Sequence, residues 1–264
     1  MKFEQKKVEH IFHYTKTFEL LKKILNNGFI PSYCFEIVGD FKYYIPMVSF
    51  CNIPLQDVHL FARYGEYGIG MNLDWAVKKS ISPVVYTHEN TVFKNLHYDI
   101  NTIQIVNMLK QMIPDTLNDI LGGEKVEKDY SSLDYLISEI NKITVPTIQH
   151  FKNWKTEYKE KQIITYHERE WRFIPQLESD YEKIVDERSK LFKKIQNNEF
   201  RKKPHFPEYP LVIENIKYIL IKNKNQREII LKILSKKFGK ENVVNSILKE
   251  NLNILTFSSI KNDF

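Results

Sequence analysis

The feature that most constrains the fold of this chain is the spacing of its apolar residues. In some short segments they recur every second residue, as in strands, and in others every three or four residues, as in helices. Residues 11–15 alternate apolar and polar side chains, as a half-buried strand does. A helical pattern follows, with Thr17 as the capping residue and Gly28 at its stop. Segments with strand spacing and segments with helix spacing also alternate through residues 44–87 and again through residues 216–257. Short segments of both types predict a mixed α+β fold, in which helices cover a sheet.

The same patterns set the expected elements and domain organisation. We expect a single α+β domain over residues 1–264, interrupted by a helical insertion over residues 90–160. The chain has 264 residues, and its 17 Phe and 15 Tyr are too many to be solvated, so it must bury a core. Strands are expected at 11–15, 44–51, 67–72, 83–87, 162–175, 216–221 and 253–257, and helices at 17–27, 54–64, 73–79, 101–113, 177–195 and 226–238.

Several classes of protein are disfavoured by what the sequence lacks. No apolar run approaches the roughly 20 residues of a membrane-spanning helix, and no signal peptide is visible. The two cysteines, Cys34 and Cys51, form neither a C-x-x-C pair nor a metal-spaced cluster. We therefore expect a cytoplasmic protein with no metal site and no membrane partner.

The net charge of +6 and the pI near 9.0 permit two interpretations. Lysines gather in residues 193–203 and 217–240, and a basic surface favours an anionic partner such as nucleic acid. Solvated lysine faces in a chain rich in Lys, Asn and Ile would give the same composition. Charge alone does not decide between them.

Residues 162–175, QIITYHEREWRFIP, hold the clearest candidates for chemistry. On a strand, Glu168 and Glu170 would point to the same side, about 7 Å apart. Two carboxylates in one cleft suit general-base work or the stabilisation of a developing cation, with Arg169 or Arg172 supplying a counter-charge. The alternative is a solvated strand face on which glutamates and arginines pair.

His13 is the second candidate, because it lies in an otherwise apolar and aromatic strand. The alternative for His13 is a core histidine satisfied by a backbone carbonyl. Residues 64–72, YGEYGIGMN, contain three of the eight glycines but match no phosphate-binding loop, and no serine stands in a G-x-S-x-G elbow.

Taken in order, five motifs resemble a known family. They are HYT (13–15), NGFIPS (27–32), IPMVSFCNIPL (45–55), YGEYGIGMNLDWA (64–76) and YHEREWRF (166–173). Together they resemble the AbiGi-type family of abortive phage-infection proteins and a related uncharacterised bacterial domain. The resemblance covers residues 10–90 and 160–260. It implies a role in phage resistance, and some members are described as the antitoxin half of a toxin–antitoxin pair.

A more distant resemblance is to the ADP-ribosyltransferases, which carry a His on a first strand, an aromatic residue beside glycines, and Glu-x-Glu on a late strand. It implies a central, mostly antiparallel sheet and NAD as the cofactor or substrate. By that resemblance His13 and its neighbour Tyr14 would hold NAD, and Tyr67, chosen over Tyr64, would stack on nicotinamide. Glu170 would be catalytic, and Glu168 would orient the acceptor. The departure is Tyr14, where the transferases usually have a small residue.

Two functions therefore follow from the sequence. The first is an NAD-dependent ADP-ribosyltransferase-like effector that modifies a protein or nucleic acid in antiphage defence. The second is a non-enzymatic antitoxin or sensor that binds and restrains a toxin or a phage-derived protein. In the second case Glu168 and Glu170 would pair with arginines or with the partner.

Overall fold

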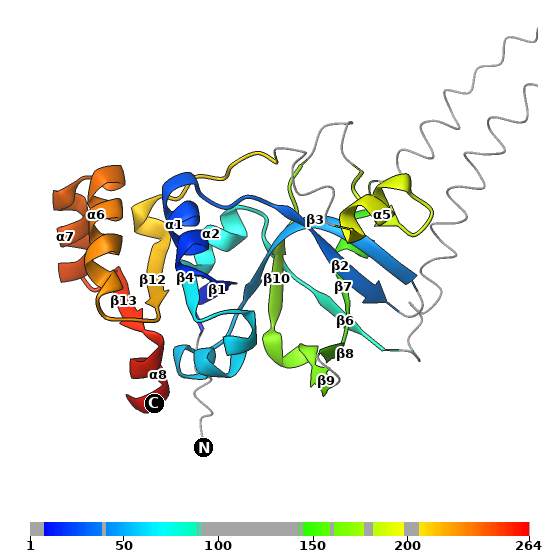
Figure 1. Cartoon of the computed structure of the whole chain (residues 1–264), viewed down its shortest axis with the longest axis horizontal. Coiled ribbons are helices and arrows are strands. Elements are labelled where there is room, and N and C mark those ends of the chain that lie inside the picture. The colour runs from blue at the N-terminus through cyan, green and yellow to red at the C-terminus, as the bar shows by residue number, and fades with distance from the viewer. Residues whose placement is uncertain are drawn as a thin grey trace, which may run out of the picture.

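The protein, seen in a computed structural model, is built around a mostly antiparallel sheet (Figure 1). The structure describes residues 8–38, 41–88, 90, 142, 145–158, 161–176, 182–197 and 206–263. The strands are β1 (His10–Thr15), β2 (Ser32–Val38), β3 (Phe41–Cys51), β4 (Tyr67–Asn72), β5 (Ser82–Pro83), β6 (Val85–Thr87), β7 (Phe151–Asn153), β8 (Lys155–Tyr158), β9 (Lys161–Ile164), β10 (Glu170–Phe173), β11 (Val185–Asp186), β12 (Ile216–Ile221) and β13 (Asn253–Thr256). The helices are α1 (Phe18–Asn27), α2 (Leu73–Lys78), α5 (Lys190–Gln196), α6 (Gln226–Phe238), α7 (Lys240–Leu248) and α8 (Phe257–Asp263), with 3₁₀ helices η1 (Leu55–Tyr64), η3 (Thr165–Glu168) and η5 (Ile213–Asn215).

The main sheet has the strand order β13-β12-β4-β1-β3-β10-β5, and β2 and β11 also pair with β3. Every described pair in this sheet is antiparallel except β12 with β13. Strands β6 and β7 form a separate parallel pair, and β8 and β9 a hairpin. The expected mixed α+β class with a mostly antiparallel sheet is confirmed.

The two halves of strand β3 pair with different strands, and an opening in the sheet lies beside β1. Its first part, residues 41–47, pairs with β2, whereas residues 48–51 pair with β10. The register of β1 on β3 consists of the pair Phe12–Cys51, after which the two strands separate. The sheet is therefore split between the end of β1 and the middle of β3.

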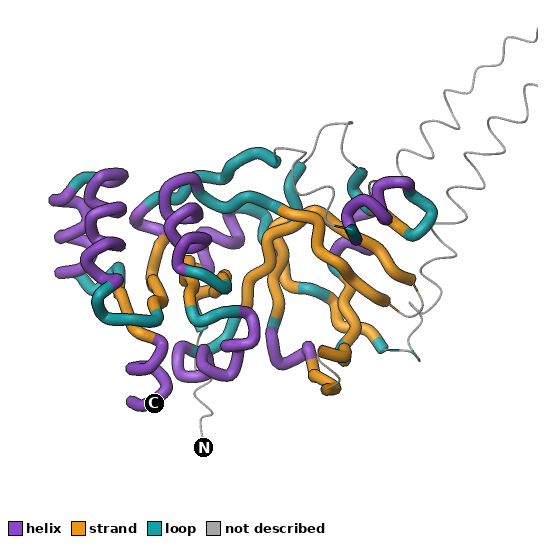
Figure 2. The backbone as a smooth tube through the Cα atoms, viewed as in Figure 1, coloured by secondary structure: helices purple, strands orange, loops and turns teal. Residues whose placement is uncertain are grey.

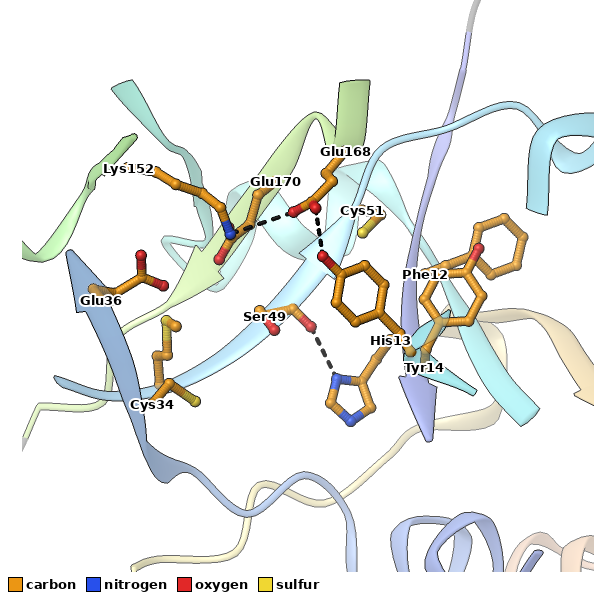
Figure 3. Close-up of a pocket in the computed structure, with 12 residues that line it drawn as sticks. Phe12, His13, Tyr14, Cys34, Glu36, Ser49, Cys51, Lys152, Glu168 and Glu170 are labelled. Atoms are coloured by element: carbon orange, nitrogen blue, oxygen red, sulfur yellow. Dashed lines mark hydrogen bonds and ion pairs between the residues drawn. The ribbon is translucent and has the colours of Figure 1, made fainter. Parts of the chain in front are cut away.

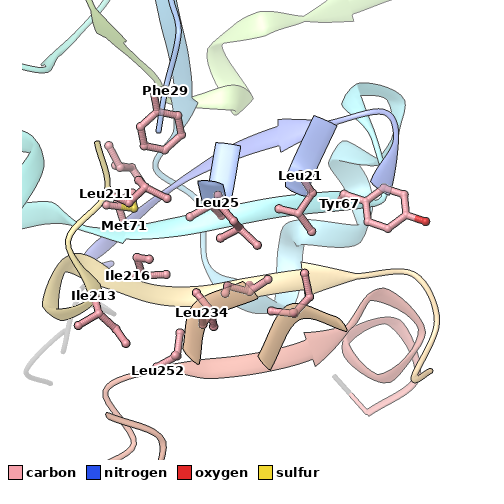
Figure 4. Packing of buried hydrophobic residues seen from close by; sticks show 14 of the residues in the cluster. Leu21, Leu25, Phe29, Tyr67, Met71, Leu211, Ile213, Ile216, Leu234 and Leu252 are labelled. Carbon is pink, nitrogen blue, oxygen red and sulfur yellow. The ribbon is translucent and has the colours of Figure 1, made fainter. Parts of the chain in front are cut away.

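Helices cover both faces of the sheet near β1, β4 and β12. On one face, α1 begins at Thr17, whose hydroxyl accepts from the Leu20 amide, and it ends at Gly28. Leu21 and Leu25, one turn apart on α1, are fully buried against β4 and α6 (Figure 4). On the other face, η1 and α8 pack over Phe12. The helices α6 and α7 gather at the β13 end, and the long strands β2 and β3 extend at the other (Figure 2).

The expected elements at 11–15, 17–27, 67–72, 73–79, 216–221, 226–238 and 253–257 are confirmed to within a residue or two. The expected strand over 162–175 is wrong, because η3 interrupts it and Arg169 follows in the left-handed region with φ 44°. The expected helix over 177–195 is wrong over its described part, where β11 precedes the short α5.

The expected helical insertion over 90–160 is described only in part. Residues 91–141, with the helix expected at 101–113, lie outside the described residues. Among its described residues, 145–149 are helical and 151–158 form β7 and β8. No described helix combines the length and apolar character that crossing a membrane requires.

Candidate functional site

A pocket of about 210 Å³ lies at the split between β1 and β3 (Figure 3). Its walls come from seven elements, which span the chain from β1 to β10. The lining residues are Phe12, His13 and Tyr14 of β1, Cys34 and Glu36 of β2, Met47, Ser49 and Cys51 of β3, Tyr64 of η1, Lys152 of β7, Glu168 of η3 and Glu170 of β10.

The pairing register explains why these side chains meet. Glu170 is opposite Cys51, which is opposite Phe12, so all three point to the same face of the sheet. Alternation along the strands then brings Ser49 and Tyr14 to that face as well. Most of the lining therefore belongs to one sheet face, at the place where the ladder between β1 and β3 stops.

Glu170 is a buried carboxylate that stays ionised. Arg172 Nε donates to its Oε1 at 2.8 Å, and Lys152 forms an ion pair with its Oε2. Burial by itself would raise the pKa of Glu170, but the charges of Arg172 and Lys152 outweigh it and lower that pKa to about 2. The backbone amide of Glu170 donates to the Tyr86 hydroxyl at 2.8 Å, which fixes the start of β10.

Glu168 reaches the same pocket from η3 and is 2% exposed. Arg63 Nη2 donates to its Oε1 at 2.8 Å, and the Tyr64 hydroxyl donates to the same oxygen. Its Oε2 lies 3.3 Å from Lys152 Nζ. Lys152 therefore holds both predicted carboxylates together, as Figure 3 shows.

Arg172 connects Glu170 to Glu36 of β2 and to the backbone at the start of β7. Its side chain is fully buried, and its Nη2 lies 2.8 Å from Glu36 Oε1. Its Nη1 donates to the carbonyls of Gln149 and Phe151 at 2.8 and 3.1 Å. Burial raises the pKa of Glu36 against the opposing charge of Arg172.

Three carboxylates and three cations thus form one network. Burial would lower the pKa of Lys152, but Glu36 and the two other carboxylates raise it well above its usual range. The formal charges of this network cancel, as they must if so many ions are to be buried. Its members are Glu36, Glu168, Glu170, Arg63, Lys152 and Arg172.

His13 and Tyr14 both line the pocket, although alternation directs them to opposite faces of β1. His13 Nδ1 lies 2.9 Å from the Ser49 carbonyl, so Nδ1 must carry the proton and donate. Burial lowers the pKa of His13, so the ring is neutral. This contact is the backbone bond expected of a core histidine. The Tyr14 hydroxyl is buried, and no described residue hydrogen-bonds to it.

Tyr67, the predicted stacking residue, does not line this pocket. It is opposite Thr15 on β1, three residues from Phe12, so its side chain points to the other face of the sheet. There its hydroxyl accepts from Gln226 Nε2 at 3.1 Å, and its ring lies near Phe18. Of the two tyrosines weighed for stacking, Tyr64 is the one that lies in the pocket, where its hydroxyl donates to Glu168.

Sequence reasoning missed Glu36, Lys152 and Tyr64 as parts of this site. No short motif joins them, because each comes from a different element, and Lys152 is one of many lysines in the chain. Among the residues that the structure describes, no group of three or more His, Cys, Asp or Glu side chains is arranged to hold a metal ion.

Comparisons with known proteins give one family. The family model described as "Putative abortive phage resistance protein AbiGi, antitoxin" matches residues 27–222. The "Abortive phage resistance protein AbiGi" of Lactococcus lactis subsp. cremoris is 28% identical over 148 residues, which are 53% of this chain. The match spans 54% of that relative, about half its length. No solved structure matches the chain.

Proposed function

Because the chain belongs to the AbiGi family of abortive phage-resistance proteins, we propose that it acts in abortive infection as an ADP-ribosyltransferase-like enzyme with NAD as its substrate. The observation that carries this proposal is the pocket, in which an ionised Glu170 and Glu168 are held beside Tyr14, Tyr64 and His13.

The buried residues of the pocket fit one end of NAD. Drug-sized ligands occupy pockets of roughly 300–1,000 Å³, so a pocket of about 210 Å³ suits a nicotinamide and its ribose and leaves the rest of the dinucleotide outside. The unpartnered Tyr14 hydroxyl offers a hydrogen bond to such a ligand. Each Glu170 oxygen accepts one bond and retains a second lone pair for a ribose hydroxyl.

The chemistry that this arrangement supports is cleavage of the bond between nicotinamide and ribose. Nicotinamide leaves with the bonding electron pair, positive charge develops at the anomeric carbon, and a nucleophile of the acceptor forms the new bond there. A fixed anionic carboxylate in a site shielded from water stabilises that charge. Glu170 remains ionised throughout the physiological pH range, and Arg172 and Lys152 hold it in place.

The acceptor would be a protein or a nucleic acid. Exposed lysines on and beside α6, among them Lys224, Lys232 and Lys236, favour an anionic acceptor. They lie on a different element from the pocket, so any such contact would position the acceptor and would not take part in the chemistry.

The test is release of nicotinamide from NAD by the purified protein, together with transfer of label from NAD to proteins or nucleic acid of a host lysate. We expect Glu170→Gln to slow both by about 10² to 10³. Glu66→Gln is the matched control, because Glu66 is an exposed partner of Lys222 and does not line the pocket. Absence of release and transfer in folded wild-type protein would contradict the enzyme.

A second candidate function is that of an antitoxin that binds and restrains a toxin. The specific observation in its favour is the description of the matching family model, which includes the word antitoxin. An enzyme of the proposed kind should slow growth when produced alone, and Glu170→Gln should relieve the effect. An antitoxin should leave growth unchanged alone, and should rescue cells that produce its toxin.

A further inference from the structure

The inner surface of the pocket is richer in carboxylates than in cations. Glu36, Glu168 and Glu170 all line it, whereas Lys152 is its one lining cation among the described residues. Two arginines outside the lining balance these carboxylates: Arg172, whose side chain has no exposed surface, pairs with Glu36 and Glu170, and Arg63 pairs with Glu168. The network as a whole is neutral, but its carboxylates and not its arginines line the pocket. A bound ligand therefore meets three carboxylates and a single ammonium group that two of them already share.

Burial raises the pKa of Glu36, and the Arg172 guanidinium 2.8 Å away opposes that rise. The other titratable groups of the lining add no positive charge. Burial keeps His13 neutral by lowering its pKa, and burial raises the pKa of Cys34 to about 11 and that of Cys51 further. Burial likewise raises the pKa of Tyr14 and Tyr64 above the usual phenol range. None of these groups offers a positive charge to an anionic ligand.

Aromatic rings form a second feature of the same pocket. Phe12, Tyr14 and Tyr64 line it together with the carboxylates, and the Tyr64 hydroxyl is fixed on Glu168. The faces of aromatic rings attract cations, and aromatic residues combined with carboxylates are the surroundings in which proteins hold organic cations away from water. A phosphate or carboxylate group would lose its hydration here and gain mostly acceptor atoms in return.

We infer that the pocket selects a flat organic cation, and that Glu36 is a specificity-determining residue for this charge. The inference rests on the proposed function in one respect: the pyridinium ring of oxidised NAD is such a cation, whereas the ring of reduced NAD is neutral. Glu36 acts through Arg172, which it shares with Glu170. Neutralising Glu36 would leave Arg172 paired with Glu170 alone and would give the network, whose formal charges otherwise cancel, a net positive charge.

The test compares three probes of nearly equal shape by calorimetric titration of the full chain. They are N1-methylnicotinamide, which is a cation, nicotinamide, which is neutral, and nicotinic acid, which is an anion. We expect the cation to bind about tenfold more tightly than nicotinamide, and the anion to show no binding. Glu36→Gln should reduce the preference for the cation several-fold, and Glu66→Gln should leave it unchanged.

Equal or tighter binding of the neutral probe by the wild-type protein would overturn the inference. If Glu36→Gln does not fold, competition between oxidised and reduced NAD on the wild-type chain supplies the second measurement, and equal affinity for the two would again overturn it. NAD cleavage without any preference for the cation would refute the inference and leave the proposed function standing. Selective binding of N1-methylnicotinamide without NAD cleavage would support the inference and contradict the proposed function.

Discussion

Replacing Arg172 with methionine tests how far the buried ion network holds the pocket together. The substitution keeps a long side chain but leaves Glu36 and Glu170 buried without their shared cation, and it frees the carbonyls of Gln149 and Phe151. Removing one partner of a buried ion pair costs about 3–5 kcal/mol of unfolding free energy. At roughly 2–4 °C per kcal/mol for a chain of this size, the melting temperature should fall by about 6–20 °C.

The assay is urea unfolding of four proteins: wild type, Arg172→Met, Glu36→Gln and the double variant. Because Glu36 and Arg172 are 2.8 Å apart, the double variant should lose less than the sum of the two single losses, by about 0.5–3 kcal/mol. Arg188→Met is the control, since Arg188 is half exposed in its pair with Asp186 and should cost below about 1 kcal/mol. Additive losses, or an Arg172→Met loss as small as the control's, would refute the reasoning.

Three further predictions concern other parts of the chain. Gly28→Ala should lower the unfolding free energy measured in urea by about 1–3 kcal/mol, because Gly28 has φ 97° and a Cβ would lie 2.0 Å from the Tyr209 carbonyl oxygen. Burial lowers the pKa of His10 from 6.5 to about 4, so the unfolded chain takes up the proton first; the melting temperature should fall as pH drops from 6.5 to 4, and His10→Gln should remove that part of the decline. Tyr64→Phe should reduce nicotinamide release and Tyr67→Phe should leave it unchanged, because only Tyr64 lines the pocket; equal effects of the two would contradict this placement.

Local signals account for the elements that the sequence predicts well. The first helix is correct at both ends because Thr17 caps it and Gly28, with positive φ, stops it. The helix α7 has no such signal, since Val243 is its one buried residue among those described, so no apolar stripe marks it. The alternation of side-chain types through residues 162–175 continues across η3. The sequence pattern therefore predicts one strand and gives no sign of the turn at Arg169.

The site was predictable only to the extent that it is local in sequence. Glu168 and Glu170 stand two residues apart, and both line the pocket, although a 3₁₀ turn and not a continuous strand brings Glu168 there. Lys152 could not be predicted, because its role depends on its side chain reaching Glu168 and Glu170 from a separate element. The choice between Tyr64 and Tyr67 depends on the register of β1 with β4, which decides the face and which no motif records.

The most direct test of the account is a crystal structure of the Glu170→Gln protein grown with NAD. The account predicts the nicotinamide and its ribose in the pocket between β1 and β3, with a ribose hydroxyl within hydrogen-bond distance of residue 170 and a ligand atom on the Tyr14 hydroxyl. NAD bound elsewhere on the chain, with the pocket holding only water, would contradict it.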